Sequence, residues 1–174
     1  MTKNLNVQFE KAVRFLCKHL PISDAESRKP ILFHDIQVGV YLHEKGYAPD
    51  IVLAGLLHDV IEWSNLTEQI LREEFGDTVT KLVLANTKND SVMDKEEKTN
   101  ELIVRCIQNG LGALIIKSAD IIDSFKWYSN QNNNEQLLYC MRNANAIIKF
   151  KPENFNDPIF EELKAWQSKF TGLN

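Results

Sequence analysis

The chain has 174 residues, with 20 Lys and Arg against 24 Asp and Glu, so its formal net charge is −4 at neutral pH. Hydrophobic residues make up 44% and charged residues 25%, the composition of an ordinary soluble globular protein. Seven Gly and five Pro are too few for a loop-rich β-sandwich or a disordered chain. The negative charge argues against a nucleic-acid polymer or a membrane surface as partner, because no global positive field attracts polyanions.

The cysteines and the start of the chain favour a reducing compartment. Cys17, Cys106 and Cys140 are far apart and form no CxxC pair, so neither a disulfide framework nor a thiolate zinc site is predicted. The N-terminal segment lacks the apolar core of a signal peptide. No stretch approaches the roughly 18 apolar residues that span a bilayer. We therefore expect a cytoplasmic protein.

Helical periodicity dominates the chain, and the alternating pattern of strands is absent. The apolar segments are separated by proline, by glycine or by residues that favour helix caps. The sequence predicts helices over residues 7–20, 31–45, 51 to about 62, 65–75, 77 to about 85, 91–109, 111–128, 134–149 and 158–170.

The segments between these helices are short. Residues 21–30 form a predicted loop, in which Ser23 and Glu26 have the spacing of a helix-capping box. Residues 130–134 form a polar linker, and we find no repeat and no linker that would divide the chain. The sequence therefore predicts one all-α domain over residues 1–174, a bundle of about eight to nine helices.

The third predicted helix ends in polar residues that could do chemistry. His58 and Asp59 follow an almost wholly apolar run, and Glu62 comes one turn later. At about 100° per residue, His58 and Glu62 are expected to share a helical face, with Asp59 beside them. Burying such groups without partners is costly. They therefore pair with bases elsewhere or bind a ligand.

Two further residues break apolar runs in the same way. His34 begins the second predicted helix, and Asp120 interrupts the apolar run of a later one. Metal sites in helical bundles are commonly built from ligands on different helices. Two imidazoles and two carboxylates suit Mn²⁺, Fe²⁺, Co²⁺ or Zn²⁺ and suit Ca²⁺ poorly. Such an ion lowers the pKa of water and shields phosphate charge, and Glu62 is placed to orient or deprotonate that water.

Ordinary structural roles for these residues stay open. A histidine on a helix is usually hydrogen-bonded or solvated, and Asp120 could pair with Lys117 on the same helical face. The remaining histidines and two further acids are expected to be surface or partly exposed groups: His19, His43, Asp35 and Asp123.

The pattern of these residues resembles the HD superfamily of metal-dependent phosphohydrolases, whose motif is H…HD…D on a helical bundle. The resemblance makes His34, His58, Asp59 and Asp120 the metal ligands and makes Glu62 the catalytic carboxylate of HDxxE. One divalent ion is implied, with Mn²⁺ expected first and Fe²⁺, Co²⁺ or Zn²⁺ as alternatives.

The sequence is most similar to the hydrolase domain of RelA/SpoT-type (p)ppGpp hydrolases and their small stand-alone homologues. The similarity lies in the stretch VLAGLLHDVIEWSNLTEQILREEFGDTVTKLVLANTK and in the later Ile-Lys-Ser-Ala-Asp segment that ends at Asp120. It covers about residues 28–128 and implies an HD-domain fold, on which C-terminal helices over 134–170 would pack. The implied activity is hydrolysis of a nucleotide-like phosphate ester or pyrophosphate, with the 3′-pyrophosphate of (p)ppGpp as one candidate.

Two positions depart from the pattern of those hydrolases. They typically read HDxxED, whereas Trp63 follows Glu62 here, and Ser124 stands where they carry an asparagine that contacts substrate. Trp63 could stack on a base or could pack the helix end. A catalytically degenerate domain that binds and senses a nucleotide is therefore the alternative to an enzyme. A purely structural helical protein is a third hypothesis and predicts no bound metal.

Basic residues near the motif are candidates for binding phosphate. Arg28 and Lys29 precede His34, and Lys117 lies near Asp120. With Ser124, they complete the predicted substrate-binding set, although Arg28 and Lys29 could equally be solvated surface charges. The expected partner is a small phosphorylated molecule, and the oligomeric state is left open.

Overall fold

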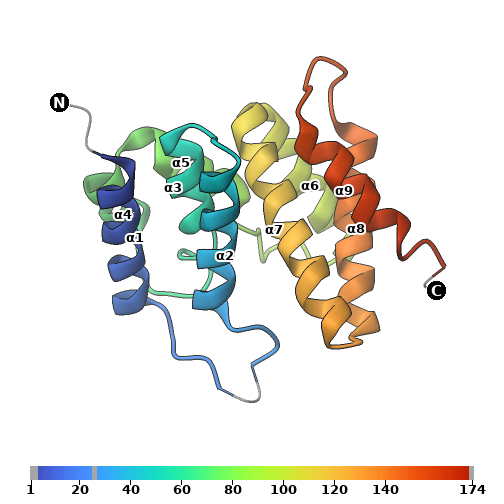
Figure 1. The fold of residues 1–174 in the computed structure, drawn as a ribbon, viewed down its shortest axis with the longest axis horizontal. Helices are drawn as coiled ribbons and strands as arrows, with labels where there is room; N and C mark the ends of the chain where they lie inside the picture. Colours follow the sequence, from blue (N-terminus) through green and yellow to red (C-terminus); the bar gives the residue numbers. More distant parts are fainter. Residues whose placement is uncertain (1–3, 25–26, 173–174) are drawn as a thin grey trace. The chain divides into compact units, whose positions relative to one another are not determined.

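The computed structural model describes residues 4–24 and 27–172, which form nine helices and no strand (Figure 1). The predicted all-α class is confirmed. In chain order the helices are α1 (Leu5–His19), α2 (Ile31–Glu44), α3 (Pro49–Leu56), α4 (Glu68–Phe75), α5 (Asp77–Asn86), α6 (Lys95–Gln108), α7 (Leu111–Asn130), α8 (Asn134–Phe150) and α9 (Pro158–Ser168). The chain divides into two compact units between Thr87 and Lys88, with α1–α5 in the first and α6–α9 in the second. That the chain forms a single domain stays a prediction.

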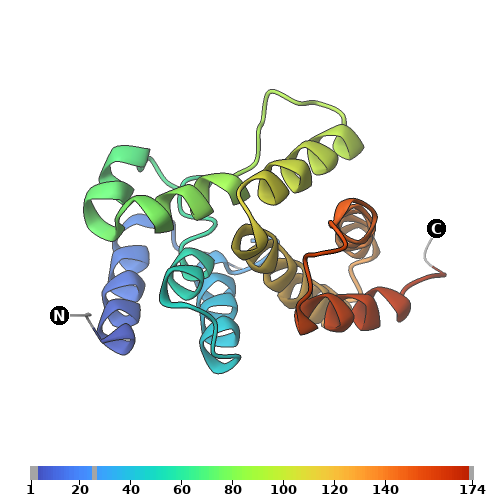
Figure 2. The same cartoon turned by 90° about the horizontal axis from the view of Figure 1, so that it is seen from above.

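The first unit is built around α3. Figure 2 shows α1, α2 and α3 side by side, and α5 packs on α3 while α4 packs on α5. Two glycines allow α2 and α3 to approach closely. A Cβ atom built on Gly39 of α2 would lie 2.9 Å from Leu56 Cβ, and one built on Gly55 of α3 would lie 2.2 Å from Leu42 Cδ1. Only glycine fits this contact without movement of its neighbours.

The second unit is built around α7, which packs on α6, α8 and α9. Most of α7 is buried, and Phe125 is fully enclosed. Its ring stacks on Phe170 at a centroid distance of 5.5 Å and on Trp166 at 6.5 Å. Phe160 and Leu163 of α9 are also buried. The apolar face of the last helix therefore covers the core of this unit.

Several helix ends are confirmed, and others differ from the prediction. Thr67 caps α4 by accepting a hydrogen bond from the Ile70 N–H, although the predicted start was Asn65. Asp94 accepts from two amides and caps α6, although the predicted start was Ser91. In both cases a later capping residue lies nearer the first apolar turn. The predicted capping box at 23–26 includes Glu26, which lies outside the described residues.

The described helices include none that is both long and apolar enough to cross a bilayer.

Candidate metal centre

Near its N-terminal end, α2 places two buried polar side chains next to each other. His34 is 1% exposed and Asp35 is fully buried. The prediction of a partly exposed Asp35 was wrong. Asp35 lies on the helical face that also carries Ile31, Val38 and Gly39, all of which are buried. That face packs against the core of the first unit, so the Asp35 carboxylate is buried together with its apolar neighbours.

His58 and Asp59 lie beyond the end of α3, and the predicted helix to about residue 62 was wrong. α3 ends at Leu56, and residues 57–62 form turns. His58 Nδ1 lies 2.8 Å from the Gly55 carbonyl oxygen, within hydrogen-bonding distance. In a continued helix this carbonyl would accept from the Asp59 N–H. The His58 imidazole lies at this carbonyl in place of the Asp59 N–H. Farther along the turn, the Glu62 N–H donates to the Asp59 carbonyl oxygen at 3.0 Å, rather than to the His58 carbonyl as in a continued helix.

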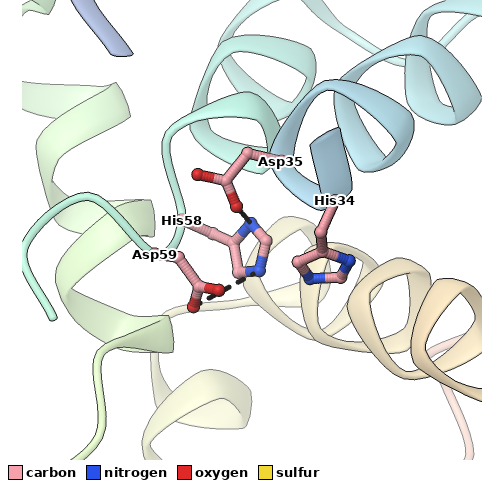
Figure 3. Close-up of side chains that lie close together, drawn as sticks. All are labelled: His34, Asp35, His58 and Asp59. Carbon is pink, nitrogen blue, oxygen red and sulfur yellow. Dashed lines mark ion pairs between the residues drawn. The ribbon is translucent and has the colours of Figure 1, made fainter. Parts of the chain in front are cut away.

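Four side chains from α2 and this turn form one group, which we call the His/Asp cluster: His34, Asp35, His58 and Asp59. Figure 3 shows the His58 ring between two carboxylates. Its Nδ1 lies 3.6 Å from Asp35 Oδ1, and its Nε2 lies 3.6 Å from Asp59 Oδ1. The rings of His34 and His58 meet edge to face, with centroids 5.1 Å apart. All four residues are buried.

The chemistry of this donor set fits a divalent metal ion. One possible ligand atom from each residue lies within 4.8 Å of the others. Two ligands that are each about 2.1 Å from one ion can be no more than about 4.2 Å apart, so small side-chain movements would bring His34, His58 and Asp59 onto one ion. Mixed imidazole and carboxylate donors suit Mn²⁺, Fe²⁺, Co²⁺ and Zn²⁺. Buried carboxylates also need a positive partner to offset their desolvation.

Comparison with known proteins shows which family the chain belongs to. Residues 12–140 match the HD domain family, which is more than half of the chain. The chain belongs to the HD domain family. The family match extends across α1–α7 and into α8. The predicted recognition of the fold and its family is therefore confirmed.

The HD domain found here is related to domains of (p)ppGpp metabolism. The chain is 23% identical over 167 residues to a guanosine-3′,5′-bis(diphosphate) 3′-pyrophosphohydrolase of Aquifex aeolicus, covering 94% of this chain and 24% of that protein. It is 35% identical over 104 residues to a GTP pyrophosphokinase of Streptomyces coelicolor, covering 58% of this chain and 12% of that protein. The chain thus spans about a quarter or less of the length of these curated relatives.

A solved structure supports the fold over nearly the full length. It is that of a metazoan ortholog of SpoT, a protein that hydrolyzes ppGpp and plays a role in starvation responses. The TM-score is 0.74, with 20% identity, and the match covers 96% of this chain and 97% of the other.

The second unit carries the remaining predicted ligand of the HD motif, Asp120 on α7. The Lys117 ammonium donates to Asp120 Oδ2 at 2.8 Å, and the Ser124 hydroxyl donates to Asp120 Oδ1 at 3.3 Å. All three side chains are buried. The pairing of Asp120 with Lys117 that the helical spacing allowed is thus confirmed. The role of Asp120 as a metal ligand, and of Lys117 and Ser124 as substrate contacts, stays a prediction.

The other predicted site residues of the HD domain lie in the first unit. Glu62 is half-buried and lies in the turn rather than on a helical face with His58. The adjacent Trp63 is 41% exposed. Arg28 is exposed, whereas Lys29 is buried, so the alternative of a solvated surface charge was wrong for Lys29. The catalytic role of Glu62 and the phosphate contacts of Arg28 and Lys29 stay predictions.

The sequence reasoning missed the part that Asp35 plays in the cluster. The two remaining histidines are not members of it. His43 is exposed, and its Nε2 lies 2.9 Å from Asn6 Oδ1, while His19 is half-buried against the Phe15 ring. The signal that could have found Asp35 was its spacing from Ile31 and Val38.

Proposed function

We propose that this HD domain protein is a metal-dependent phosphohydrolase that acts on a nucleotide-like phosphate ester or pyrophosphate. The observation that carries the proposal is the buried His/Asp cluster in a member of the HD domain family. The proposed metal ligands are His34, His58 and Asp59, with Asp120 as the fourth. The proposed ion is Mn²⁺, and Fe²⁺, Co²⁺ and Zn²⁺ are the alternatives that the same donors accept.

A bound divalent ion would supply a Lewis acid that lowers the pKa of water and offsets phosphate charge. The residues of the chain orient the His58 ring toward the ion and orient the attacking water. Because His58 Nδ1 faces the Gly55 carbonyl at 2.8 Å, the ring proton belongs on Nδ1, and Nε2 keeps its lone pair for a metal. The Asp59 carboxylate lies on that side of the ring. Glu62 follows in the same turn, and we propose that its carboxylate orients or deprotonates the attacking water.

The substrate class follows from the charge of the proposed contacts. We propose that Arg28, Lys29 and Lys117 meet phosphate groups and that Ser124 contributes a hydroxyl, because cations and hydroxyl donors are the usual partners of phosphate oxygens. The 3′-pyrophosphate of (p)ppGpp is the first substrate to test, since the Aquifex aeolicus relative is named a 3′-pyrophosphohydrolase and the metazoan SpoT ortholog is described as hydrolyzing ppGpp.

A panel of nucleotides tests the activity. The protein is stripped of metal by a chelator, reloaded with Mn²⁺ and incubated with mononucleotides and with ppGpp, and the products are identified. We expect turnover that needs the metal, that is lost in Asp59→Asn, and that survives in His43→Ala, whose exposed ring serves as the matched control. Pyrophosphate released from ppGpp would identify a 3′-pyrophosphohydrolase, whereas orthophosphate released from a mononucleotide would identify a phosphatase.

The same panel separates an enzyme from a sensor. The half-exposed Trp63 at the position after Glu62 is the observation that favours a domain that only binds. Absence of turnover on every nucleotide, together with equal nucleotide affinity of the parent and Glu62→Ala, would replace the enzyme with a sensing domain. Absence of metal in the purified protein by elemental analysis, and of Mn²⁺ binding by the stripped protein, would favour a purely structural role.

A further inference from the structure

Asp35 is the member of the His/Asp cluster that the H…HD…D motif does not include. We propose that Asp35 is a positioning residue whose buried carboxylate holds the His58 ring with Nε2 directed toward the metal and strengthens that nitrogen as a ligand. The inference rests on the proposed metal site and deepens it. It concerns the neighbours of a ligand, and it adds no ligand to the ion.

One hydrogen-bond acceptor and one nearby carboxylate lie beside the same ring nitrogen, the carboxylate beyond hydrogen-bonding distance. The Gly55 carbonyl oxygen lies 2.8 Å from His58 Nδ1, and Asp35 Oδ1 lies 3.6 Å from the same atom. Figure 3 shows Asp35 on this side of the ring and Asp59 on the other. Both neighbours of Nδ1 favour a proton there. The tautomer that leaves Nε2 free to bind a metal is therefore selected by a backbone group and by a charge.

The charge of Asp35 is offset further when a divalent ion is bound. The side chain is fully buried on a helical face whose neighbours, such as Ile31 and Val38, are apolar. An apolar residue there would fold the chain without desolvating a carboxylate. In the metal-free protein, Asp35 also brings a second carboxylate close to Asp59 within the cluster. A divalent ion offsets both charges, so the free energy that Asp35 contributes depends on the ion.

The position of Asp35 argues against direct ligation. The ring nitrogen that faces Asp35 is Nδ1, which bonds to the Gly55 carbonyl. The nitrogen available to a metal is Nε2, on the edge of the ring that faces Asp59. A carboxylate beside the protonated nitrogen of a metal-binding histidine raises the basicity of that histidine. Loss of a partner that accepts the N–H hydrogen bond typically lowers metal affinity about 10- to 100-fold, and the effect of Asp35, at 3.6 Å, is expected at or below the lower end of that range.

The test compares metal affinity with stability in the metal-free protein. Asp35→Asn keeps the size and one oxygen acceptor and removes the charge, Asp35→Ala removes both, and Asp50→Asn is the control because Asp50 is exposed on α3. The Kd for Mn²⁺ is measured on stripped full-length protein by electron paramagnetic resonance of the free ion. The Tm of each metal-free protein is measured in parallel.

We expect Asp35→Asn to raise the Mn²⁺ Kd by a factor of up to about ten, whatever its effect on the metal-free Tm. The Asp50→Asn control should keep the parent Kd. An unchanged Kd in Asp35→Asn would overturn the proposal, whatever happens to the Tm. A fall in metal-free Tm with an unchanged Kd would show a purely structural role.

X-ray absorption of the Co²⁺-loaded proteins separates positioning from ligation. The same number of oxygen and nitrogen donors in parent and Asp35→Asn supports the proposal. Loss of one donor would show that Asp35 is itself a ligand and would overturn it. Mn²⁺ binding by the unsubstituted parent protein distinguishes a failure of this inference from a failure of the proposed function. If the parent binds no Mn²⁺, both fail, whereas a parent that binds Mn²⁺ alongside a variant of equal affinity removes only the role of Asp35.

Discussion

Gly55→Ala adds one methyl group at the contact between α2 and α3, the helices that position the His/Asp cluster. The new Cβ atom would lie 2.2 Å from Leu42 Cδ1 and 3.5 Å from Val38 Cγ1. Carbon atoms in contact are about 3.5–4.0 Å apart, so the Leu42 methyl must move by about 1.5 Å. Leu42 is fully buried. The movement therefore displaces other core side chains or separates the two helices.

Two opposing effects set the size of the change. Overpacking a core costs about 1–3 kcal/mol, and alanine gains up to about 1 kcal/mol over glycine inside a helix. We expect a net loss of about 1 kcal/mol, which lowers the Tm of a chain of this size by about 2–4 °C. The Gly55 carbonyl also holds His58 Nδ1. A shift of this turn of α3 should weaken Mn²⁺ binding as well.

Urea denaturation of a double-mutant cycle measures the effect. Leu42→Val shortens the side chain that the new methyl group meets, at a cost of about 1 kcal/mol by itself. If Gly55 and Leu42 are in contact as described, the double variant should be more stable than the sum of the single changes by about 0.5 kcal/mol or more. Gly172→Ala is the control, because a Cβ built there meets nothing within 4 Å.

Two results would refute this reasoning. One is a Gly55→Ala variant more stable than the parent by the whole helix-propensity gain. The other is a strictly additive cycle with unchanged Mn²⁺ affinity. Either would mean that the close approach of α2 and α3 does not depend on this glycine.

Three further predictions concern the metal, the thiols and the exposed indole. Mn²⁺ at about 100 times its Kd should stabilise the parent by about 2.7 kcal/mol and raise its Tm in thermal melts; an equal rise in His58→Ala would contradict the ligand assignment. Burial raises the pKa of the Cys106 thiol to about 12, so at about pH 8 a thiol-reactive dye should label the exposed Cys17 and spare the buried Cys106 and Cys140 until the chain unfolds. Since the folded pKa lies above the ordinary value of 9.0, this thiol should also make stability fall as the pH rises from about 9 toward about 12; rapid labelling of all three thiols in the native protein would argue against this burial. Trp63→Ala should change the free energy of unfolding by less than about 1 kcal/mol, because the side chain is 41% exposed, and should raise the KM for a nucleotide substrate; a large loss of stability would assign the indole to packing.

The helix boundaries that could be predicted are those set by local backbone chemistry. Gly46, Gly76 and Gly110 adopt φ values of 74°, 87° and 96°, and each stands where the sequence predicted a helix to end. Glycine reaches this region without steric cost, so the residue itself carries the signal. The end of α3 carried no such signal. There the His58 imidazole lies at the Gly55 carbonyl that the next helical amide would use, and helical periodicity does not contain that information.

The sequence allowed three of the cluster residues to be predicted, but it did not allow the positions of their side chains relative to one another to be predicted. His34, His58 and Asp59 were singled out because each interrupts an apolar run, and the structure brings them within one cluster. Asp35 was missed because a carboxylate is usually solvated. Its neighbours at helical spacing, Ile31 and Val38, were apolar and indicated the buried face. The role of Asp120 rests on the resemblance and stays a prediction.

The early end of α3 has a consequence for how two adjacent residues can serve one ion. Along a helix, consecutive side chains diverge by about 100°, although His34 and Asp35 of α2 still bring donor atoms within 4.8 Å of each other. In the turn after Leu56, Nε2 of His58 and Oδ1 of Asp59 lie closer, 3.6 Å apart. The turn therefore presents a nitrogen donor and an oxygen donor of one dipeptide to the same point. A substitution that lengthened α3 by one turn would leave both side chains chemically intact and change the distance between their donor atoms.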